Sequence, residues 1–345
     1  MNDKITYKDA GVDIANADAT KKEMLSALHS RDARIINRDA SFAALFAADF
    51  PGIKSPVLVL KTEEPGSKQW LAFKHKRVRG ICFDLINHLI NDIVVMGARP
   101  LAVLDTIICG KLQKDVVLEL VHGISDACRE QGCSLVGGET SEQPGVLEEG
   151  SYVLSASVVG VVDRDKVVDG SRIEAGDVVL ALAANGLHTN GYTLVRRLLD
   201  KQPGLAEKRL GNETFLDAIM RPHRAYAGHL LPLFERFDIR GLAHITGGGV
   251  EGNLNRVLPS NLDAKIDLGA LRVLPVFSMI KEAGSVPDED MRRTYNLGVG
   301  MTLVAKADQA DKIRESLSAD GCETWVIGGI IPGNGTVQVQ GKIGW

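Results

Sequence analysis

Three side chains able to bind a metal ion recur at helical spacing within Val78–Met96. Asp84, His88 and Asp92 stand four residues apart, and Asn91 falls on the same side of a helix. Carboxylate oxygens are the ligands that Mg²⁺ and Ca²⁺ prefer, so this row could hold a divalent cation. Spacing alone favours an ordinary solvent-exposed polar face, which is what most such rows are.

Two glycines followed by a glutamate come directly after an apolar run, in Val136–Thr140 (VGGET). Gly137 and Gly138 lack a side chain and would let a ligand approach the backbone. Glu139 could then bind a metal ion or act as a general base. A simple turn would account for the same residues, so both interpretations stay open.

A histidine, a hydroxyl and an amide lie between two glycines in Ala184–Tyr192 (ANGLHTNGY). The pattern is typical of a turn from a strand into a helix. Free backbone N–H groups at a helix start suit an anion, and a titratable ring beside them suits proton transfer. His188 is therefore a candidate site residue, with Thr189 and Asn190 beside it, although a purely structural histidine fits as well.

A second histidine precedes a run of glycines in His244–Gly252 (HITGGGVEG). Three of these glycines match the G-x-G-x-x-G spacing of dinucleotide-binding folds, and Asp267 follows 20 residues beyond the first of them. We discount that interpretation because Gly241–Thr246 makes a poor buried strand and no following strand is obvious. The sequence instead predicts a glycine-rich phosphate cradle at the start of a helix. P-loop, G-x-S-x-G and H-E-x-x-H patterns do not occur in the sequence.

The apolar pattern predicts the elements that must position these residues. In the first half of the chain we expect strands and helices in turn, and Gly97 and Pro100 end the longest helix. The expected strands are Pro56–Leu60, Leu101–Ile108, Cys133–Val136 and Tyr152–Val162. The expected helices are Val78–Met96 and Val116–Gln131.

A polar stretch, Asp163–Gly176, marks a candidate domain boundary because a second set of strands and helices follows it. The expected strands of this set are Val178–Ala183, Gly298–Ala305 and Thr324–Gly328. The expected helices are Asn190–Leu199, His223–Phe237 and Asp308–Ser318. The fold class is therefore α/β (α+β) with two domains, residues 1–170 and 171–345.

The composition is that of a globular protein large enough for two domains. The 345 residues are 45% hydrophobic and 24% charged, with a formal net charge of −4 and no block of basic residues. These values argue against long disorder and against nucleic acid as the main partner. No run approaches the ~18 apolar residues of a membrane span, and the N-terminus lacks the apolar core of a signal peptide. Five cysteines without a C-x-x-C pair indicate buried, reduced thiols, so we expect a cytoplasmic enzyme.

Seven segments, in order and in register from about residue 5 to residue 330, resemble the phosphoribosylformylglycinamidine cyclo-ligase (aminoimidazole ribonucleotide synthetase) family. One such segment would be weak evidence, whereas seven with matching order and spacing are specific. The superfamily relatives selenophosphate synthetase and thiamine monophosphate kinase lack the opening segment in this form. The segments are Ile5–Ile14, Gly110–Leu112, Ser134–Thr140, Pro144–Gly145, His188–Tyr192, His244–Gly249 and Arg293–Met301.

The resemblance implies a two-domain aminoimidazole ribonucleotide synthetase-like fold and a homodimer in which the N-terminal sheets pair. It also implies ATP and Mg²⁺ in the N-terminal domain, and a role in de novo purine biosynthesis. In this family ATP phosphorylates the formyl amide oxygen of formylglycinamidine ribonucleotide, and a nitrogen of the amidine then closes the ring of aminoimidazole ribonucleotide. The protein would mainly position the groups and neutralise phosphate charge.

The family's motifs, carried over position by position, give each candidate residue a role. The predicted catalytic residues are His188, His244 and Glu139. The predicted metal ligands are Asp92, Asp84 and Glu63. The predicted ATP and phosphate contacts are Thr62, Glu63, Gly66, Ser67, Lys68, Asn91, Gly137 and Gly138. The predicted substrate contacts are Thr189, Asn190, Thr246, Gly247, Gly248 and Gly249.

Three departures from the family pattern fall at the predicted nucleotide site. Ala40–Phe46 (ASFAALF) replaces a loop of the type Gly-Gly-Phe-Gly-(Gly/Ala)-Leu-Phe, and Thr62–Lys68 (TEEPGSK) replaces Thr-Asp-Gly-Val-Gly-Thr-Lys. Asn87 and His88 replace small residues. Side chains in place of glycines hinder a close approach of phosphate to the backbone, and Glu63 in place of Asp moves a carboxylate by about 1.5 Å.

Three interpretations therefore stay open. The chain is an active cyclo-ligase with an unusual nucleotide loop, a kinase-like paralogue acting on another small molecule, or a non-catalytic dimeric homologue that has lost ATP turnover. The segments around Glu139, His188 and His244 favour the first two, whereas the altered loop favours the third.

Overall fold

The computed structural model describes residues 14–24, 32–36 and 42–345. The opening segment of the family resemblance therefore lies outside the described residues, apart from Ile14. Residues 40 and 41 of the altered loop lie outside them as well.

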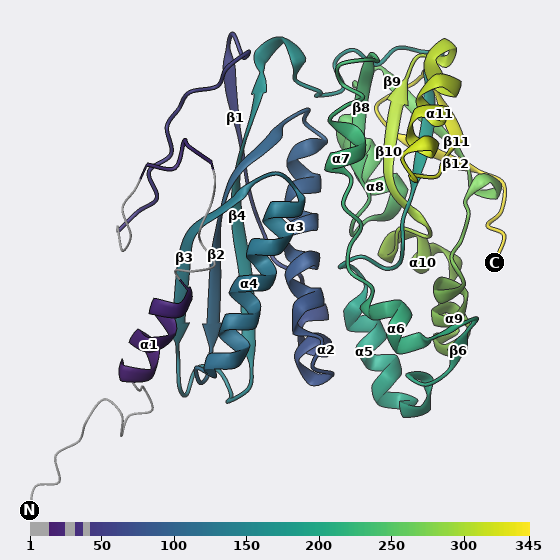
Figure 1. Ribbon diagram of the computed structural model, residues 1–345. Coiled ribbons are helices and arrows are strands. Elements are labelled where there is room, and N and C mark those ends of the chain that lie inside the picture. Colours follow the sequence, from purple (N-terminus) through teal and green to yellow (C-terminus); the bar gives the residue numbers. More distant parts are fainter. Residues whose placement is uncertain (1–13, 25–31, 37–41) are drawn as a thin grey trace, which may run out of the picture.

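The N-terminal domain is built on a four-stranded mixed sheet with the strand order β1-β4-β2-β3. Strand β4 pairs antiparallel with both β1 and β2, and β2 pairs parallel with β3. Helices α3 and α4 cover one face of this sheet, and α1 packs against α4 (Figure 1). The strands are β1 (Pro56–Glu63), β2 (Arg99–Cys109), β3 (Ser134–Glu142) and β4 (Tyr152–Asp163), and the helices are α1 (Ile14–Met24), α2 (Lys68–Lys74), α3 (Val78–Val94) and α4 (Lys114–Glu130).

The C-terminal domain is built on a six-stranded mixed sheet with the order β12-β9-β11-β5-β10-β8. The strands are β5 (Val178–Ala183), β8 (Ile239–His244), β9 (Leu262–Asp267), β10 (Val299–Ala305), β11 (Thr324–Pro332) and β12 (Val337–Gln340), with a short hairpin of β6 (Arg209–Leu210) and β7 (Glu213–Thr214). The helices are α5 (Tyr192–Lys201), α6 (Phe215–Met220), α7 (Ala227–Leu230), α8 (Gly249–Leu254), α9 (Pro275–Gly284), α10 (Asp288–Thr294) and α11 (Ala310–Ala319).

Helix α3 lies between the two domains (Figure 1). Its apolar residues, among them Ile81, Leu85 and Leu89, are fully buried and belong to one hydrophobic core that continues into the C-terminal sheet. Because a helix with apolar residues on most of its surface must be covered on most sides, the sequence of α3 fits this central position. The five cysteines are all free and buried, as expected. Among the described residues, no helix is long and apolar enough to cross a membrane.

Most of the expected elements are present, but the helix expected at His223–Phe237 is wrong. Within that stretch only α7, Ala227–Leu230, is an α-helix. The chain before it runs as an irregular loop whose backbone groups bond to side chains of α3. The side chains of Asn87 and Asn91 bind these backbone groups and so replace the hydrogen bonds that a helix would supply.

The prediction that no buried strand precedes the second glycine run is also wrong. Strand β8 occupies Ile239–His244, with every residue buried, and β9 follows α8. Gly241 looked unfavourable for a strand, but its site leaves no room for a side chain. A Cβ at Gly241 would lie 2.7 Å from Cδ1 of Ile173.

Candidate active site

The polar row of α3 faces the C-terminal domain rather than solvent, which corrects the expectation from spacing alone. Asp84 and Asn91 are fully buried, and Asn87 is buried as well. The amide of Asn87 donates to the carbonyl of His223 at 2.7 Å, and that of Asn91 to the carbonyl of Arg224 at 2.9 Å. The row therefore fastens the loop before α7 onto the N-terminal domain.

A buried ion pair lies at one end of this row. The Lys68 ammonium donates to Asp84 Oδ1 at 2.7 Å and to the carbonyls of Arg221 and His188 at 2.7 and 3.1 Å. Burial lowers the pKa of Lys68 and raises the pKa of Asp84 to about 6, while the attraction between the two groups opposes both shifts. All three donors of the ammonium are used. The geometry does not fit the predicted role of Lys68 in phosphate binding or that of Asp84 in metal binding.

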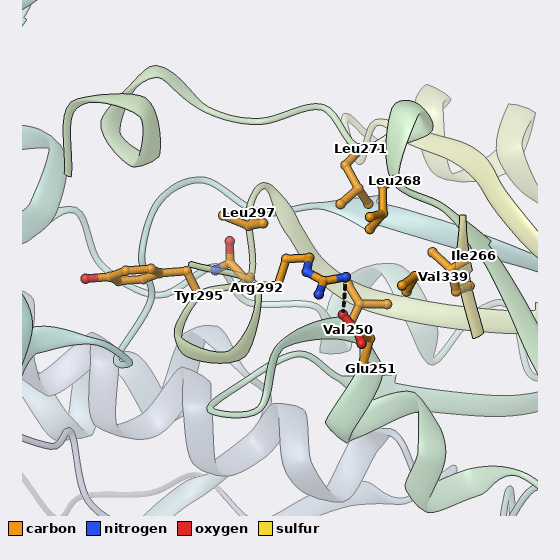
Figure 2. Close-up of a pocket in the computed structure, with 10 residues that line it drawn as sticks. Val250, Glu251, Ile266, Leu268, Leu271, Arg292, Tyr295, Leu297 and Val339 are labelled. Carbon is orange, nitrogen blue, oxygen red and sulfur yellow. Dashed lines mark ion pairs between the residues drawn. The ribbon is translucent and has the colours of Figure 1, made fainter. Parts of the chain in front are cut away.

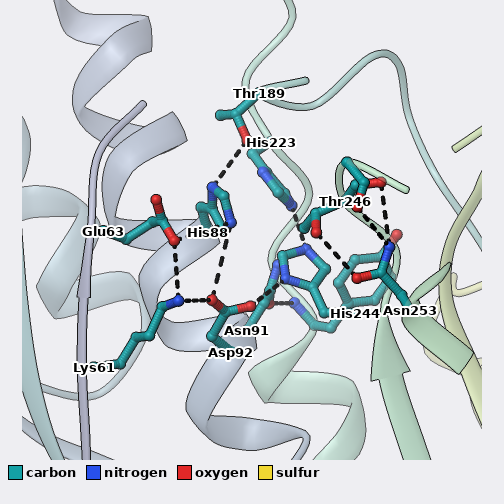
Figure 3. A network of polar contacts seen from close by, with 12 residues as sticks. Lys61, Glu63, His88, Asn91, Asp92, Thr189, His223, His244, Thr246 and Asn253 are labelled. Atoms are coloured by element: carbon teal, nitrogen blue, oxygen red, sulfur yellow. Dashed lines mark hydrogen bonds and ion pairs between the residues drawn. The ribbon is translucent and has the colours of Figure 1, made fainter. Parts of the chain in front are cut away.

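Four buried histidines meet where the domains touch, and three of them, His88, His223 and His244, are labelled in Figure 3. His188 stacks on His223 with ring centroids 3.9 Å apart, and His223 Nε2 lies 2.9 Å from His244 Nε2. His88 of α3 lies within 5.3 Å of His223 and 5.2 Å of His244, between ring centroids. The Nδ1 atom of His88 bonds to the hydroxyl of Thr189 at 2.9 Å.

Asp92 links this histidine cluster to β1. Its Oδ1 lies 2.7 Å from His244 Nδ1, and its Oδ2 lies 3.0 Å from the ammonium of Lys61. The same ammonium lies 3.1 Å from Glu63 Oε2. Burial alone would raise the pKa of Asp92, but the bond with His244 and the nearby cations outweigh it and hold this pKa well below its usual range. Burial and the neighbouring His244 lower the pKa of His88 to about 4.

The two glycine turns of the C-terminal domain lie side by side at the edge of this cluster. Asn190 approaches Gly247, because a Cβ at Gly247 would lie 3.4 Å from Asn190 Oδ1. The second turn is held by Asn253, whose amide donates to the carbonyls of Thr246, Gly247 and Gly249. The Nδ2 of Asn190 is buried and has no partner in the described structure, so this amide is available to a ligand.

The cavity in Figure 2 offers no alternative site. It lies among α8, β9, α10 and β12 and is lined mostly by apolar side chains, with Arg292 bonded to Glu251 at 3.2 Å. Its volume of about 10 Å³ suits no more than one water molecule.

Comparison with known proteins agrees with this architecture. Residues 53–162 match the N-terminal domain of the AIR synthase related proteins, and residues 174–340 match their C-terminal domain. The chain is 42% identical over 328 residues to the phosphoribosylformylglycinamidine cyclo-ligase of Methylobacillus flagellatus, covering 94% of each chain. It is 40% identical over 334 residues to that of Sorangium cellulosum, covering 95% of each. The chain belongs to the phosphoribosylformylglycinamidine cyclo-ligase family.

Solved structures with lower sequence identity share the fold. Thiamine-monophosphate kinase from Stenotrophomonas maltophilia has a TM-score of 0.66 at 20% identity, covering 96% of this chain and 98% of its own. The hydrogenase maturation protein HypE of E. coli has a TM-score of 0.67 at 16% identity and covers 94% of both chains. HypE in complex with ATP has a TM-score of 0.66 at 18% identity, covering 95% of this chain and 91% of its own. These similarities show that the chain has a two-domain α/β fold with two mixed sheets.

The family's motifs fall at different places in this structure. The histidines at 188 and 244, together with Thr189, Asn190 and the glycines at 247–249, gather at the domain boundary. Gly66 joins them, because a Cβ there would lie 3.2 Å from the carbonyl of Thr189. Thr62 does not, because its hydroxyl bonds to Ser157 on the opposite face of the sheet.

Glu139 lies apart from the histidine cluster. It stands on β3, at the far edge of the sheet from β1, and three strand spacings amount to roughly 14 Å. There it lines a hollow between β3 and α1. The neighbouring Gly138 is needed for packing, because a Cβ would lie 1.8 Å from Asp105 Oδ1. Catalysis by Glu139 beside His188 and His244 does not fit this geometry within one chain.

Sequence reasoning missed three residues, two at the histidine cluster and one beside Gly138. Lys61 precedes a recognised motif, and His223 was assigned to a helix that does not form. Asp105 lies within an expected strand but is buried, and burial raises its pKa to about 7. An aspartate in an apolar strand is a signal that could have been found in the sequence, because buried carboxylates are uncommon without a functional reason.

Proposed function

We propose that this chain catalyses the ATP-dependent ring closure of formylglycinamidine ribonucleotide to aminoimidazole ribonucleotide, a step of purine biosynthesis. The observation that carries the proposal is the near-full-length identity of about 40% to cyclo-ligases. The geometry supports it, because His188 and His244 lie together with two glycine turns at the domain boundary.

The chemistry asks the protein for a phosphate-binding surface and a group that takes a proton. ATP transfers its terminal phosphoryl group to the formyl amide oxygen, and the attacking nitrogen then expels that oxygen as inorganic phosphate. We assign the proton transfer from the attacking nitrogen to His244, because Asp92 holds its Nδ1 and leaves Nε2 as the base. The glycine turn at 247–249 and the amide of Asn190 are suited to hold the substrate's phosphate.

Two of the three predicted metal ligands fit Mg²⁺. Glu63 and Asp92 both contact the ammonium of Lys61, so their carboxylates face a common point where a cation is already held. Mg²⁺ would take oxygen ligands there once Lys61 moves aside, and it would neutralise charge on the phosphates of ATP. Asp84 does not fit because it is buried against Lys68.

We further propose a homodimer that pairs the N-terminal sheets. Leu58, Leu60 and Leu104 are 53%, 69% and 45% exposed. The strand register brings them to one face of the sheet, opposite α3. A contiguous apolar patch on a soluble protein is typical of an interaction surface.

A coupled assay tests the activity. Purified chain is incubated with formylglycinamidine ribonucleotide and Mg-ATP, and both ADP and the imidazole product are measured. Equal amounts of the two products support the proposal. ADP formed only with a different small-molecule acceptor would favour the kinase-like alternative, and the absence of ADP with every acceptor would favour the non-catalytic one. The matched control is His122→Gln, because His122 is exposed on α4.

The altered nucleotide loop has its own test. The reversion Glu63→Asp, Glu64→Gly and Pro65→Val, combined with Ala40→Gly, Ser41→Gly and Ala43→Gly, restores the family pattern. We expect calorimetry to show tighter ATP binding by the reverted chain, because glycines admit phosphate and the negative charge of Glu64 is removed. Equal affinity in both chains would mean that the departures are compensated elsewhere.

A further inference from the structure

One ring nitrogen of the histidine cluster faces two carboxylates without bonding to either. His88 is 7% exposed, and its Nδ1 atom bonds to the hydroxyl of Thr189 at 2.9 Å. Its Nε2 atom lies 3.7 Å from Glu63 Oε2 and 4.0 Å from Asp92 Oδ2, which is too far for a hydrogen bond. Buried polar groups in native proteins are nearly always paired, so the Nε2 atom of His88 needs an explanation.

The two carboxylate oxygens nearest this nitrogen already hold a cation. The Lys61 ammonium lies 3.1 Å from Glu63 Oε2 and 3.0 Å from Asp92 Oδ2, so the same two oxygens face both Lys61 and His88 (Figure 3). His88 and Asp92 stand four residues apart on α3, and Glu63 reaches them from β1. The side chains of Glu63 and Asp92 are 21% and 19% exposed, so solvent reaches the point on which the three ligand atoms converge.

The separations of these atoms suit the ligands of one octahedral ion. Ligand atoms about 2.1 Å from such an ion stand about 3.0 Å apart when adjacent and about 4.2 Å apart when opposite. The two distances from His88 Nε2 fall between these values. Side-chain shifts of about 1 Å or less therefore bring all three atoms into the positions of one ion, which would replace the ammonium of Lys61.

Thr189 allows His88 to present a lone pair to that ion. A hydroxyl both donates and accepts hydrogen bonds, so the oxygen of Thr189 can accept from Nδ1–H of His88. Nε2 then carries the lone pair, and the negative charge of two carboxylates opposes this arrangement unless a cation lies between them. Metal-bound histidines typically donate their other ring N–H to an oxygen in this way. Asp92 is also held from behind, because its Oδ1 bonds to His244 Nδ1 at 2.7 Å.

We propose that His88 binds this cation through Nε2, as the third protein ligand beside Glu63 and Asp92, and that the nitrogen makes the site select Mn²⁺ over Mg²⁺. The inference rests on the proposed function, because it names the ion taken by the cation site of the proposed ring-closing enzyme. Mg²⁺ favours oxygen ligands, whereas transition-metal ions bind imidazole well. Mn²⁺ also accepts carboxylates and octahedral geometry. Three protein ligands leave positions open for water and for phosphate oxygens of ATP.

His244 is the other histidine near these carboxylates, and its nitrogens are engaged elsewhere. His88, Asp92 and His244 gather their ligand atoms within 4.8 Å of one another. The Nδ1 atom of His244 bonds to Asp92 Oδ1, and its Nε2 atom lies 2.9 Å from His223 Nε2. The nitrogen that reaches the ion should therefore come from His88, and a variant of His88 alone separates the two histidines.

The test measures metal binding directly and does not depend on enzymatic activity. Tag-free protein is dialysed against a chelator and titrated with Mn²⁺, and Mg²⁺ affinity is obtained by competition. Electron spin-echo envelope modulation of the bound Mn²⁺ detects nitrogen coordinated directly to the ion. We expect one Mn²⁺ per chain with one directly bound nitrogen, and tighter binding of Mn²⁺ than of Mg²⁺. His88→Ala should lose the nitrogen signal and about tenfold or more in Mn²⁺ affinity, while its Mg²⁺ affinity should hardly change.

The surface control His122→Gln should keep both the signal and the preference, because His122 is exposed on α4. Circular dichroism verifies that each variant is folded, and His88→Gln replaces His88→Ala if the latter is not. Any of three outcomes would overturn the proposal: no Mn²⁺ bound to the unsubstituted chain, no nitrogen signal from it, or a signal and a preference that persist without His88. A chain that closes the ring with Mg²⁺ but shows no bound nitrogen would keep the proposed function and reject this inference. A chain without cyclo-ligase activity could still show the nitrogen.

Discussion

Asp92 of α3 and His244 of β8 form a 2.7 Å hydrogen bond across the domain boundary, although 152 residues separate them in the sequence. The carboxylate fixes the tautomer of the ring and leaves the lone pair on Nε2, which faces His223 Nε2 at 2.9 Å. The bond thus couples the packing of the two domains to the chemistry of one nitrogen. Relative motion of the domains would change that nitrogen's position and basicity together.

Asp92→Asn should lower kcat by about 10²-fold or more, because an asparagine amide cannot favour the imidazole tautomer that the base requires. Steady-state assays with the natural substrate, repeated over a range of pH, measure this effect. The control Asp308→Asn changes an exposed residue and should behave like the unsubstituted chain. A pH profile and kcat that stay the same in Asp92→Asn would remove His244 from the role of base.

Lys68→Met should destabilise the protein by about 3–5 kcal/mol, because it leaves the carboxylate of Asp84 buried without its cation. The double variant Lys68→Met with Asp84→Leu should lose less than the sum of the two single changes, since no unpaired charge remains. Urea unfolding of all three variants gives the coupling free energy. Additive losses would mean that the ion pair contributes nothing as a pair.

Local pattern was enough to predict most elements of the fold. Strand β5 has the bounds that were expected, and α3 differs from its expected range only at its end, because both carry a clear apolar periodicity over their length. The sequence also singles out His188 and His244, since glycines beside them indicate turns that approach a ligand, and their catalytic role stays a prediction. The sequence pattern therefore predicts those residues whose neighbours in the sequence are themselves characteristic.

Residues positioned by distant contacts could not be predicted in this way. His223 sits in a loop whose conformation depends on bonds to Asn87 and Asp84 of α3, more than 130 positions away. Lys61 meets Asp92 only because β1 and α3 pack together. The sequence of α3 alone also predicts a solvent-exposed polar face, because the loop that covers this face comes from a distant part of the chain.

Stability should fall with pH because of Asp105. Burial raises its pKa to about 7, against 3.8 for the ordinary group, so the folded protein binds the proton more tightly than the unfolded chain. The native state then loses stability as pH rises from about 4 through 7. Asp105→Asn should therefore gain up to a few kcal/mol relative to the unsubstituted chain at pH 8 and little at pH 4. Urea unfolding at both pH values measures this difference, and an equal effect at both would contradict it.

Leu60→Glu should dissociate the proposed homodimer. Leu60 is the most exposed of the three leucines on the outer face of the N-terminal sheet, and a charge buried in an apolar interface is strongly unfavourable. Light scattering at micromolar concentration should give a dimer for the unsubstituted chain and a monomer for the variant. The control Val326→Glu changes an exposed apolar residue of the other sheet. A monomer in the unsubstituted chain would reject the dimer outright.

Lys61→Met should strengthen divalent-cation binding at Glu63 and Asp92. In the present structure the Lys61 ammonium lies 3.0 Å from Asp92 Oδ2 and 3.1 Å from Glu63 Oε2, so an incoming Mg²⁺ must displace a cation already in place. Without that ammonium, the two carboxylates face each other unneutralised, and a divalent ion relieves their repulsion. We expect about a tenfold gain in affinity, roughly 1.4 kcal/mol, which is the size of one ion-pair contact at partial exposure.

Paramagnetic resonance with Mn²⁺ as the probe ion measures this affinity in the presence and absence of ATP. The matched control is Lys61→Arg, which keeps the positive charge and should bind Mn²⁺ as the unsubstituted chain does. A second variant, Lys61→Met with Asp92→Asn, should lose the gain because one of the two carboxylates is gone. If Lys61→Met binds Mn²⁺ no better than Lys61→Arg, the ammonium does not compete with the metal ion, and Mg²⁺ must reach the nucleotide through other ligands.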